Sequence, residues 1–75
     1  MEDEIMAQIY TALIQQRKEW WIGWIEEIPG VNCQERTRDE LLDALRITLI
    51  EALEFNREQA ISVAESEYQE VAIQV

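Results

Sequence analysis

Few residues of this 75-residue chain could carry catalytic chemistry. It has no histidine, so the usual general base at neutral pH is missing. Cys33 is the only cysteine, and it has no histidine partner and no recognisable basic pocket, which predicts a buried or idle thiol. Glu26 and Glu27 are neighbours on a predicted strand and would point to opposite faces, so they would not form a catalytic dyad. We therefore expect no enzymatic activity.

The same residues predict that no metal or cofactor is bound. A single cysteine excludes an intrachain disulfide, and one thiol without histidine cannot build a structural zinc site. No glycine-rich phosphate-binding loop occurs in the sequence. Binding, rather than catalysis, is the function class that remains.

All three tryptophans lie in one short run, WWIGWIEEIPG, which begins at Trp20. Tryptophan and isoleucine favour strands, so the run predicts a strand from Trp20 to about Glu27. The Pro29-Gly30 turn would end it. Side chains alternate along a strand, so this one would be apolar on both faces. One face carries Trp21, Gly23 and Ile25, and the other carries Trp20, Ile22 and Trp24.

The two faces of this strand are predicted to have different roles. Gly23 indicates a close approach by another element, so we place the chain's own helix on its face. The face of Trp20, Ile22 and Trp24 is predicted to contact a partner or a second copy, since tryptophan is enriched at the energetic centres of interfaces. Two alternatives stay open: all three rings belong to the core, or the face stacks single-stranded RNA bases.

The charge of the chain is strongly acidic. Sixteen acidic residues against six basic ones give a net charge of −10. Such a surface repels phosphate, which disfavours direct nucleic-acid binding, and it would attract a basic partner. The alternative is that the charge only keeps the protein soluble.

The segment before the tryptophan run is ambiguous. Ile5, Ile9 and Leu13 recur at helical spacing, with Met6, Tyr10 and Ile14 one step on, but residues 9–14 also fit a strand buried on both faces. Residues 15–19 are polar and of hairpin-loop length, and this context favours the strand. A short third strand is expected over residues 31–36.

A capping box, Thr37-Arg38-Asp39-Glu40, predicts the start of the main helix. Helical periodicity continues to about Phe55, with one broad apolar stripe. That stripe consists of Leu41, Leu42, Ala44, Leu45, Leu49, Ala52, Leu53 and Phe55. Ile47 and Ile50 fall on the polar side, adjacent to each other at a spacing of three, and are predicted to contact another subunit.

Beyond Asn56 the helical pattern slips. A helix continuing to Ser66 would be about 43 Å long, which is long for so small a domain, so we expect a break near Asn56 and a short second helix over residues 58–66. The last eight residues, YQEVAIQV, alternate and predict a terminal strand whose buried face carries Gln69, Val71, Ile73 and Val75.

Chain size limits the architecture to one domain over residues 1–75. A core this small is marginal, and without a disulfide or metal we expect a homo-oligomer, a dimer or a tetramer. No apolar run approaches the roughly 20 residues that a membrane span needs. The start, Glu2-Asp3-Glu4, has the wrong charge for a leader, so we expect a cytoplasmic location.

Several elements together resemble the HicB-type antitoxin domain. Tyr10 stands where the family's first strand begins, and Trp21, Gly23 and Ile25 stand at its aromatic, small and apolar strand positions. Ile28-Pro29-Gly30 matches the family's turn, and Thr37, Glu40 and Leu41 match its threonine-capped helix. The resemblance covers roughly residues 9–55.

This resemblance implies an α+β fold, in which a three-stranded antiparallel sheet carries one main helix on a face and a further strand follows. It implies that residues 9–14 form a strand. It also implies binding to a HicA-type toxin, a small basic ribonuclease that cuts messenger RNA, whose active site the antitoxin covers. The alternative is a structural or regulatory homo-oligomer without a toxin.

The chain departs from the family pattern at two positions. Glu26 stands where a proline is frequent, and Arg36 stands where a glycine often precedes the capping threonine. Many members also carry a DNA-binding module after the main helix. Only about 20 residues, with a net acidic charge, follow that helix here, so the resemblance does not extend to repression through DNA binding.

Overall fold

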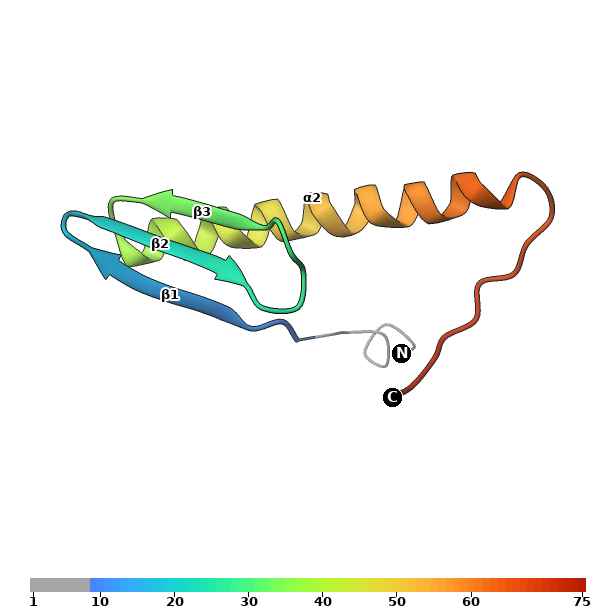
Figure 1. Ribbon diagram of the computed structural model, residues 1–75, viewed down its shortest axis with the longest axis horizontal. Helices are drawn as coiled ribbons and strands as arrows, with labels where there is room; N and C mark the ends of the chain where they lie inside the picture. The colour runs from blue at the N-terminus through green and yellow to red at the C-terminus, as the bar shows by residue number, and fades with distance from the viewer. Residues whose placement is uncertain (1–8) are drawn as a thin grey trace.

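The structure, a computed structural model, describes residues 9–75. Three strands, β1 (Ala12–Arg17), β2 (Trp20–Ile25) and β3 (Asn32–Glu35), are followed by one long helix, α2 (Arg38–Ala64) (Figure 1). The strands form an antiparallel sheet in the order β1-β2-β3. The expected α+β class, the three-stranded antiparallel sheet and the single main helix are therefore confirmed.

The ambiguous first segment contains a strand, but it covers Ala12–Arg17 instead of the expected residues 9–14. β1 continues through Arg17, so the turn to β2 consists only of Lys18 and Glu19, and the prediction of a loop over residues 15–19 was wrong. Lys18 has a φ of 59°, the left-handed conformation that tight two-residue hairpins require. The part of the helical pattern that involved Ile5 and Met6 lies outside the described residues.

The main helix begins where the capping box predicted. The Thr37 side-chain oxygen accepts a hydrogen bond from the Glu40 backbone N–H at 3.1 Å, which satisfies one of the free donors at the helix start. The first half of α2 then packs over β2 and β3. Four apolar side chains are buried at this contact: Ile25, Val31, Leu41 and Leu45. The small core therefore lies between one face of the sheet and the first half of the helix.

Gly23 permits this close packing. It is buried on the helix-facing side of β2, where a Cβ would lie 3.1 Å from Leu41 Cδ2 and 2.9 Å from Ile14 Cγ2. Trp21 and Ile25, its neighbours on the same face, pack in the same cluster. The predicted placement of the helix over this face of β2 is confirmed.

The helix does not break at Asn56. α2 is continuous from Arg38 to Ala64, so both the predicted break and the predicted short second helix were wrong. Its 27 residues span roughly 40 Å, and its second half projects beyond the end of the sheet (Figure 1). Phe55, which the periodicity placed on the apolar stripe, is 60% exposed because no sheet lies beneath it.

The chain after α2 runs back beside the helix in an extended form. No strand forms within residues 66–75, so the predicted terminal strand is absent from this structure. Arg57 on α2 and Glu70 on this segment form an ion pair with a distance of 3.0 Å between Nη2 and Oε2. The molecule is elongated, with extents of 51 × 28 × 18 Å. Within residues 9–75, no helix has the length and apolar character needed to cross a membrane.

Candidate interaction surface

No element among residues 9–75 packs on the face of the sheet opposite α2, and we call this face the open face. Directly opposed residues of neighbouring strands share a face, so the strand register assigns its members. Trp20, Ile22 and Trp24 are opposed by Arg17, Gln15 and Leu13 on β1, and Gln34 and Asn32 on β3 complete the set. The predicted grouping of Trp20, Ile22 and Trp24 on the side away from the helix is confirmed by the register.

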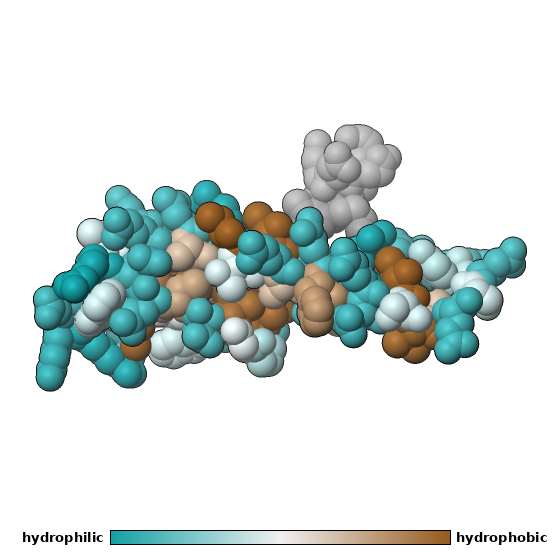
Figure 2. Space-filling model, turned by 90° about the horizontal axis from the view of Figure 1, so that it is seen from above, coloured by the Kyte–Doolittle hydropathy of each residue, from teal (hydrophilic) through white to brown (hydrophobic). Residues whose placement is uncertain are grey.

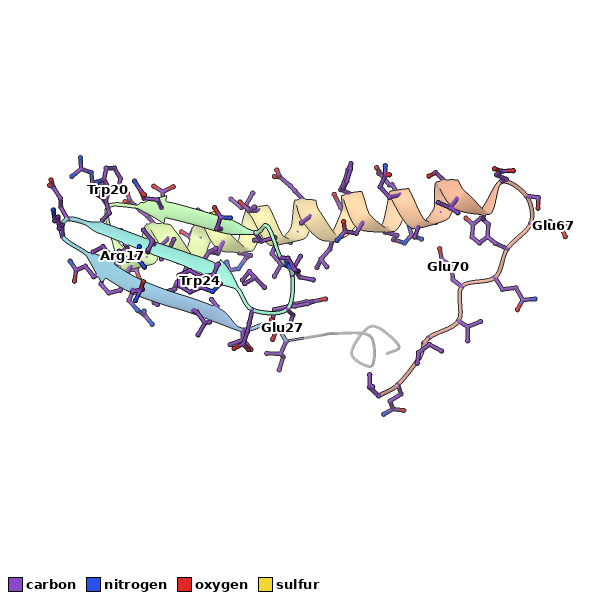
Figure 3. All side chains as sticks on the ribbon, viewed as in Figure 1. Arg17, Trp20, Trp24, Glu27, Glu67 and Glu70 are labelled. Atoms are coloured by element: carbon purple, nitrogen blue, oxygen red, sulfur yellow. The ribbon has the colours of Figure 1, made fainter. Side chains whose placement is uncertain are left out.

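The open face has an apolar centre. Trp24 is 37% exposed and its cross-strand partner Leu13 is 41% exposed, while Trp20 and Ile22 are half-buried. Figure 3 shows Trp20 and Trp24 spaced along β2. Leu13 was not predicted to belong to this patch. The sequence does carry a signal for it, because Leu13 alternates with Ala12 and Ile14, which face the core.

The tryptophan nearest the hairpin is held by charged neighbours. The Arg36 guanidinium lies 4.2 Å from the centroid of the Trp20 ring, within cation–π range. The same guanidinium donates to Glu19 Oε1 at 3.1 Å. Both members of the ion pair are well exposed, so it adds little stability, but it orients Arg36 over the ring. One side of Trp20 is thus already covered.

Charge is distributed unevenly over the molecule. The open face carries Arg17, which donates to Gln15 Oε1 at 2.6 Å, and is bordered by Arg36. Residues 39–75 hold nine acidic residues and two arginines, so the negative charge is concentrated on α2 and the segment after it. Figure 2 shows apolar surface in separate patches between hydrophilic side chains on the side seen from above.

The five predicted interface residues do not form one surface. Ile47 and Ile50 are 58% and 50% exposed on α2, directed away from the sheet. Trp20, Ile22 and Trp24 lie on the far side of the sheet from that helix. The structure therefore separates them into two surfaces, and only the tryptophan-bearing one is a continuous apolar patch with a neighbour on an adjacent strand.

Cys33 and Glu27 have structural contacts. Cys33 is half-buried between β3 and α2, and its Sγ lies 3.5 Å from Thr48 Oγ1. Glu27 Oε1 accepts a hydrogen bond from the Thr11 backbone N–H at 2.9 Å, and this bond lowers the pKa of the Glu27 carboxyl. Among residues 9–75, no three histidine, cysteine or acidic side chains come together as a metal site would need.

The backbone of Glu26 adds a second hydrogen bond to Thr11, next to the one made by the Glu27 side chain. Its N–H donates to the Thr11 carbonyl at 2.8 Å, so residues 26 and 27 together extend the β1–β2 pairing beyond Ile25. The two glutamates thus hold the start of β1 to the end of β2.

Comparison with protein-family models, with curated proteins and with solved structures finds no match to this chain.

Proposed function

We propose that this chain is a binding protein whose open face contacts a partner protein, and that, as the HicB-type resemblance implies, the partner is a small basic HicA-type ribonuclease. The observation that carries this proposal is the Leu13–Trp24 pair, which stays more than a third exposed on a sheet face that no helix among residues 9–75 covers. In this proposal the chain acts in the cytoplasm by masking the toxin, not by catalysis.

The apolar centre of the open face would supply affinity. Burying a large side chain that is partly exposed removes apolar area from water, and tryptophan is among the residues most often found at energetic centres. Polar side chains surround the centre, as in the rim of a typical interface: Gln15, Arg17, Asn32 and Gln34. The composition of the face thus fits a protein partner.

The acidic charge would supply attraction over distance. Because nine of the sixteen acids lie on α2 and beyond, most of the negative charge would not pair directly with groups bound on the open face. A net charge of −10 nevertheless raises the rate at which a basic protein encounters the chain, and this contribution weakens as salt is added. We therefore assign steering to the charge and affinity to the tryptophan patch.

A second candidate function is a homo-oligomer that buries the open face of one copy against another, without a toxin. The apolar row Trp20, Ile22 and Trp24 along β2 favours it, because two copies could bury this row against each other. Arg17 of one copy would then lie against the open face of the other copy, because a two-fold axis relates the two faces. The two candidates use the same residues, so an experiment must separate them.

The proposal is tested by co-expressing the chain with a basic protein of about 60–80 residues encoded beside it, and by measuring complex formation and messenger RNA cleavage. Trp24→Glu should abolish both the complex and the protection of RNA. Val63→Glu is the matched control: it adds the same charge at a residue that is 77% exposed on the projecting half of α2 and should leave both intact.

Light scattering on the isolated chain then separates the candidates. If Trp24→Glu converts an oligomer to monomer while no basic partner is ever recovered, the homo-oligomer is supported and the antitoxin function is rejected. If Trp24→Glu still binds and masks the toxin as well as the parent chain does, the open face is not the binding surface.

A further inference from the structure

A second apolar surface lies beside α2, under the edge of β1. α2 packs over β2 and β3, which leaves the helix-facing side of β1 with open space beneath it. A groove of ≈ 340 Å³ occupies this space, and its lining is apolar apart from Arg46. The lining residues are Tyr10, Ala12, Ile25, Leu42, Leu45, Arg46 and Leu49. The outer edge of β1 pairs with no strand among the described residues.

The segment after α2 has the pattern of a strand without a strand to pair with. Val71, Ile73 and Val75 alternate with Ala72 and Gln74, and the three apolar residues are 69%, 80% and 120% exposed. A row of exposed branched apolar residues at strand spacing is the pattern of an element that is half-buried in a sheet. Its backbone forms no ladder in residues 66–75.

The long helix keeps this segment away from the groove of its own chain. Val71 lines the same hollow as three residues of α2, Arg57, Ala60 and Ile61, so it lies beside this part of the helix. Arg57 is twelve residues beyond Leu45, which is about 18 Å along the helix. Even fully extended, the chain from Val71 to Val75 covers only about 13 Å, so with Val71 beside Arg57 its apolar residues cannot fill the groove as far as Leu42.

The exposed area is large enough to include an interface with a second copy. The chain exposes 6558 Å², whereas a compact monomer of 8.9 kDa exposes about 4,800 Å². The excess is on the order of 1,700 Å², about twice the roughly 800 Å² that each partner contributes to a standard stable interface. A second copy placed in the reverse direction would bring its own residues 71–75 to this groove.

We propose that two copies of this chain exchange residues 71–75, each adding a strand to the outer edge of the other's β1. Val71, Ile73 and Val75 of one copy then fill the groove of its partner, and Ala72 and Gln74 face outward. The exchange is reciprocal, so the dimer closes around a two-fold axis and leaves no free β1 edge. The open face with Trp24 remains accessible, so this dimer and the proposed function are independent.

The first test is the mass of the full chain in solution, measured by light scattering. The parent chain should be a dimer, and Ile73→Asp should convert it to a monomer, with a loss of at least tenfold in the dimerisation constant. Gln74→Asp is the matched control, since it adds the same charge one residue away on the outward side and should leave the dimer intact. A parent chain that is monomeric at tens of micromolar would overturn the proposal.

The second test locates the contact. In a Cys33→Ser background, one chain carries Gln15→Cys on β1 and a second, isotopically labelled chain carries Ala72→Cys or Gln74→Cys. Oxidation of the mixture should give a disulfide between differently labelled chains. A disulfide that forms only when both cysteines are in one chain would show closure within a single molecule and reject the exchange.

Two other results would also reject the exchange. A dimer that is lost with Trp24→Glu and unaffected by Ile73→Asp would place the contact on the open face. Cross-linking of the β1 cysteine to Met6→Cys, instead of to residue 72 or 74, would assign the β1 edge to residues 1–8.

Discussion

Gly23 and Leu41 face each other at the tightest point between the sheet and the helix. The position of a Cβ on residue 23 would be 3.1 Å from Leu41 Cδ2 and 3.1 Å from the Leu13 carbonyl oxygen. Leu41 is fully buried, and the backbone oxygen of Leu13 belongs to the paired neighbouring strand, so neither atom can move freely. This relationship fixes how closely α2 lies on β2.

Gly23→Ala should therefore destabilise the fold. The added methyl group would also lie 2.9 Å from Ile14 Cγ2, so the helix or β1 must shift. Overpacking of this kind costs about 1–3 kcal/mol in the free energy of unfolding. Urea denaturation followed by circular dichroism measures it. Gln34→Ala, at an exposed position on the opposite face of the same sheet, should change stability by less than about 0.5 kcal/mol. Equal costs for the two variants would contradict the packing described here.

Thr37→Ala should remove the helix cap. The Thr37 oxygen accepts the Glu40 N–H at 3.1 Å, and loss of such a cap costs about 1 kcal/mol. The same denaturation experiment measures the loss. Thr37→Ser keeps the hydroxyl and should retain most of the stability, which separates the hydrogen bond from the threonine methyl group. If serine and alanine were equally destabilising, the cap would not be the source of the effect.

Glu27 should titrate below the ordinary value for a glutamate. The Thr11 N–H donates to the charged carboxylate, so its pKa is lower in the folded chain than in the unfolded chain. The resulting stabilisation is present above the unfolded pKa and is lost as the pH falls through the folded pKa. In an NMR titration the Thr11 amide proton should shift with the same midpoint as the Glu27 carboxyl. Glu27→Gln should abolish that step in the Thr11 signal, and its persistence would point to another titrating group.

The two halves of α2 should differ in stability. Residues 41–52 include the buried Leu41 and Leu45, whereas Phe55 and Val63 are 60% and 77% exposed on the projecting half. Segments with few buried contacts open locally more often. Amide hydrogens of residues 55–64 should therefore exchange with solvent faster than those of residues 45–52, measured by NMR in heavy water. Equal protection of both halves would mean that another molecule covers the projecting half.

The sequence predicted the elements that have strong local signals. The alternation around Gly23 located β2 and its helix-facing side, and the Thr37–Glu40 capping box located the start of α2. The polarity of Gln15 and Arg17 predicts a loop, but both residues lie in β1 on a face that no element of residues 9–75 covers, where polar side chains are tolerated in a strand.

The helix length and the terminal segment could not be predicted from periodicity. After Asn56 the apolar stripe ends because the sheet ends, and the helix continues on the intrinsic propensity of residues such as Glu58, Gln59 and Ala60. No glycine or proline follows Gly30 to stop it. The alternation of residues 71–75 does indicate a strand, but a strand needs a neighbour, and the sequence does not say which chain supplies one.

The projecting half of α2 also sets the distance between the core and the end of the helix. From Ala52, the last residue packed near the core, to Ala64 is about 18 Å of continuous helix. Whatever is joined at Glu65 is held at a set distance from the tryptophans, so energy transfer from them to a dye placed there would report the straightness of that helix directly.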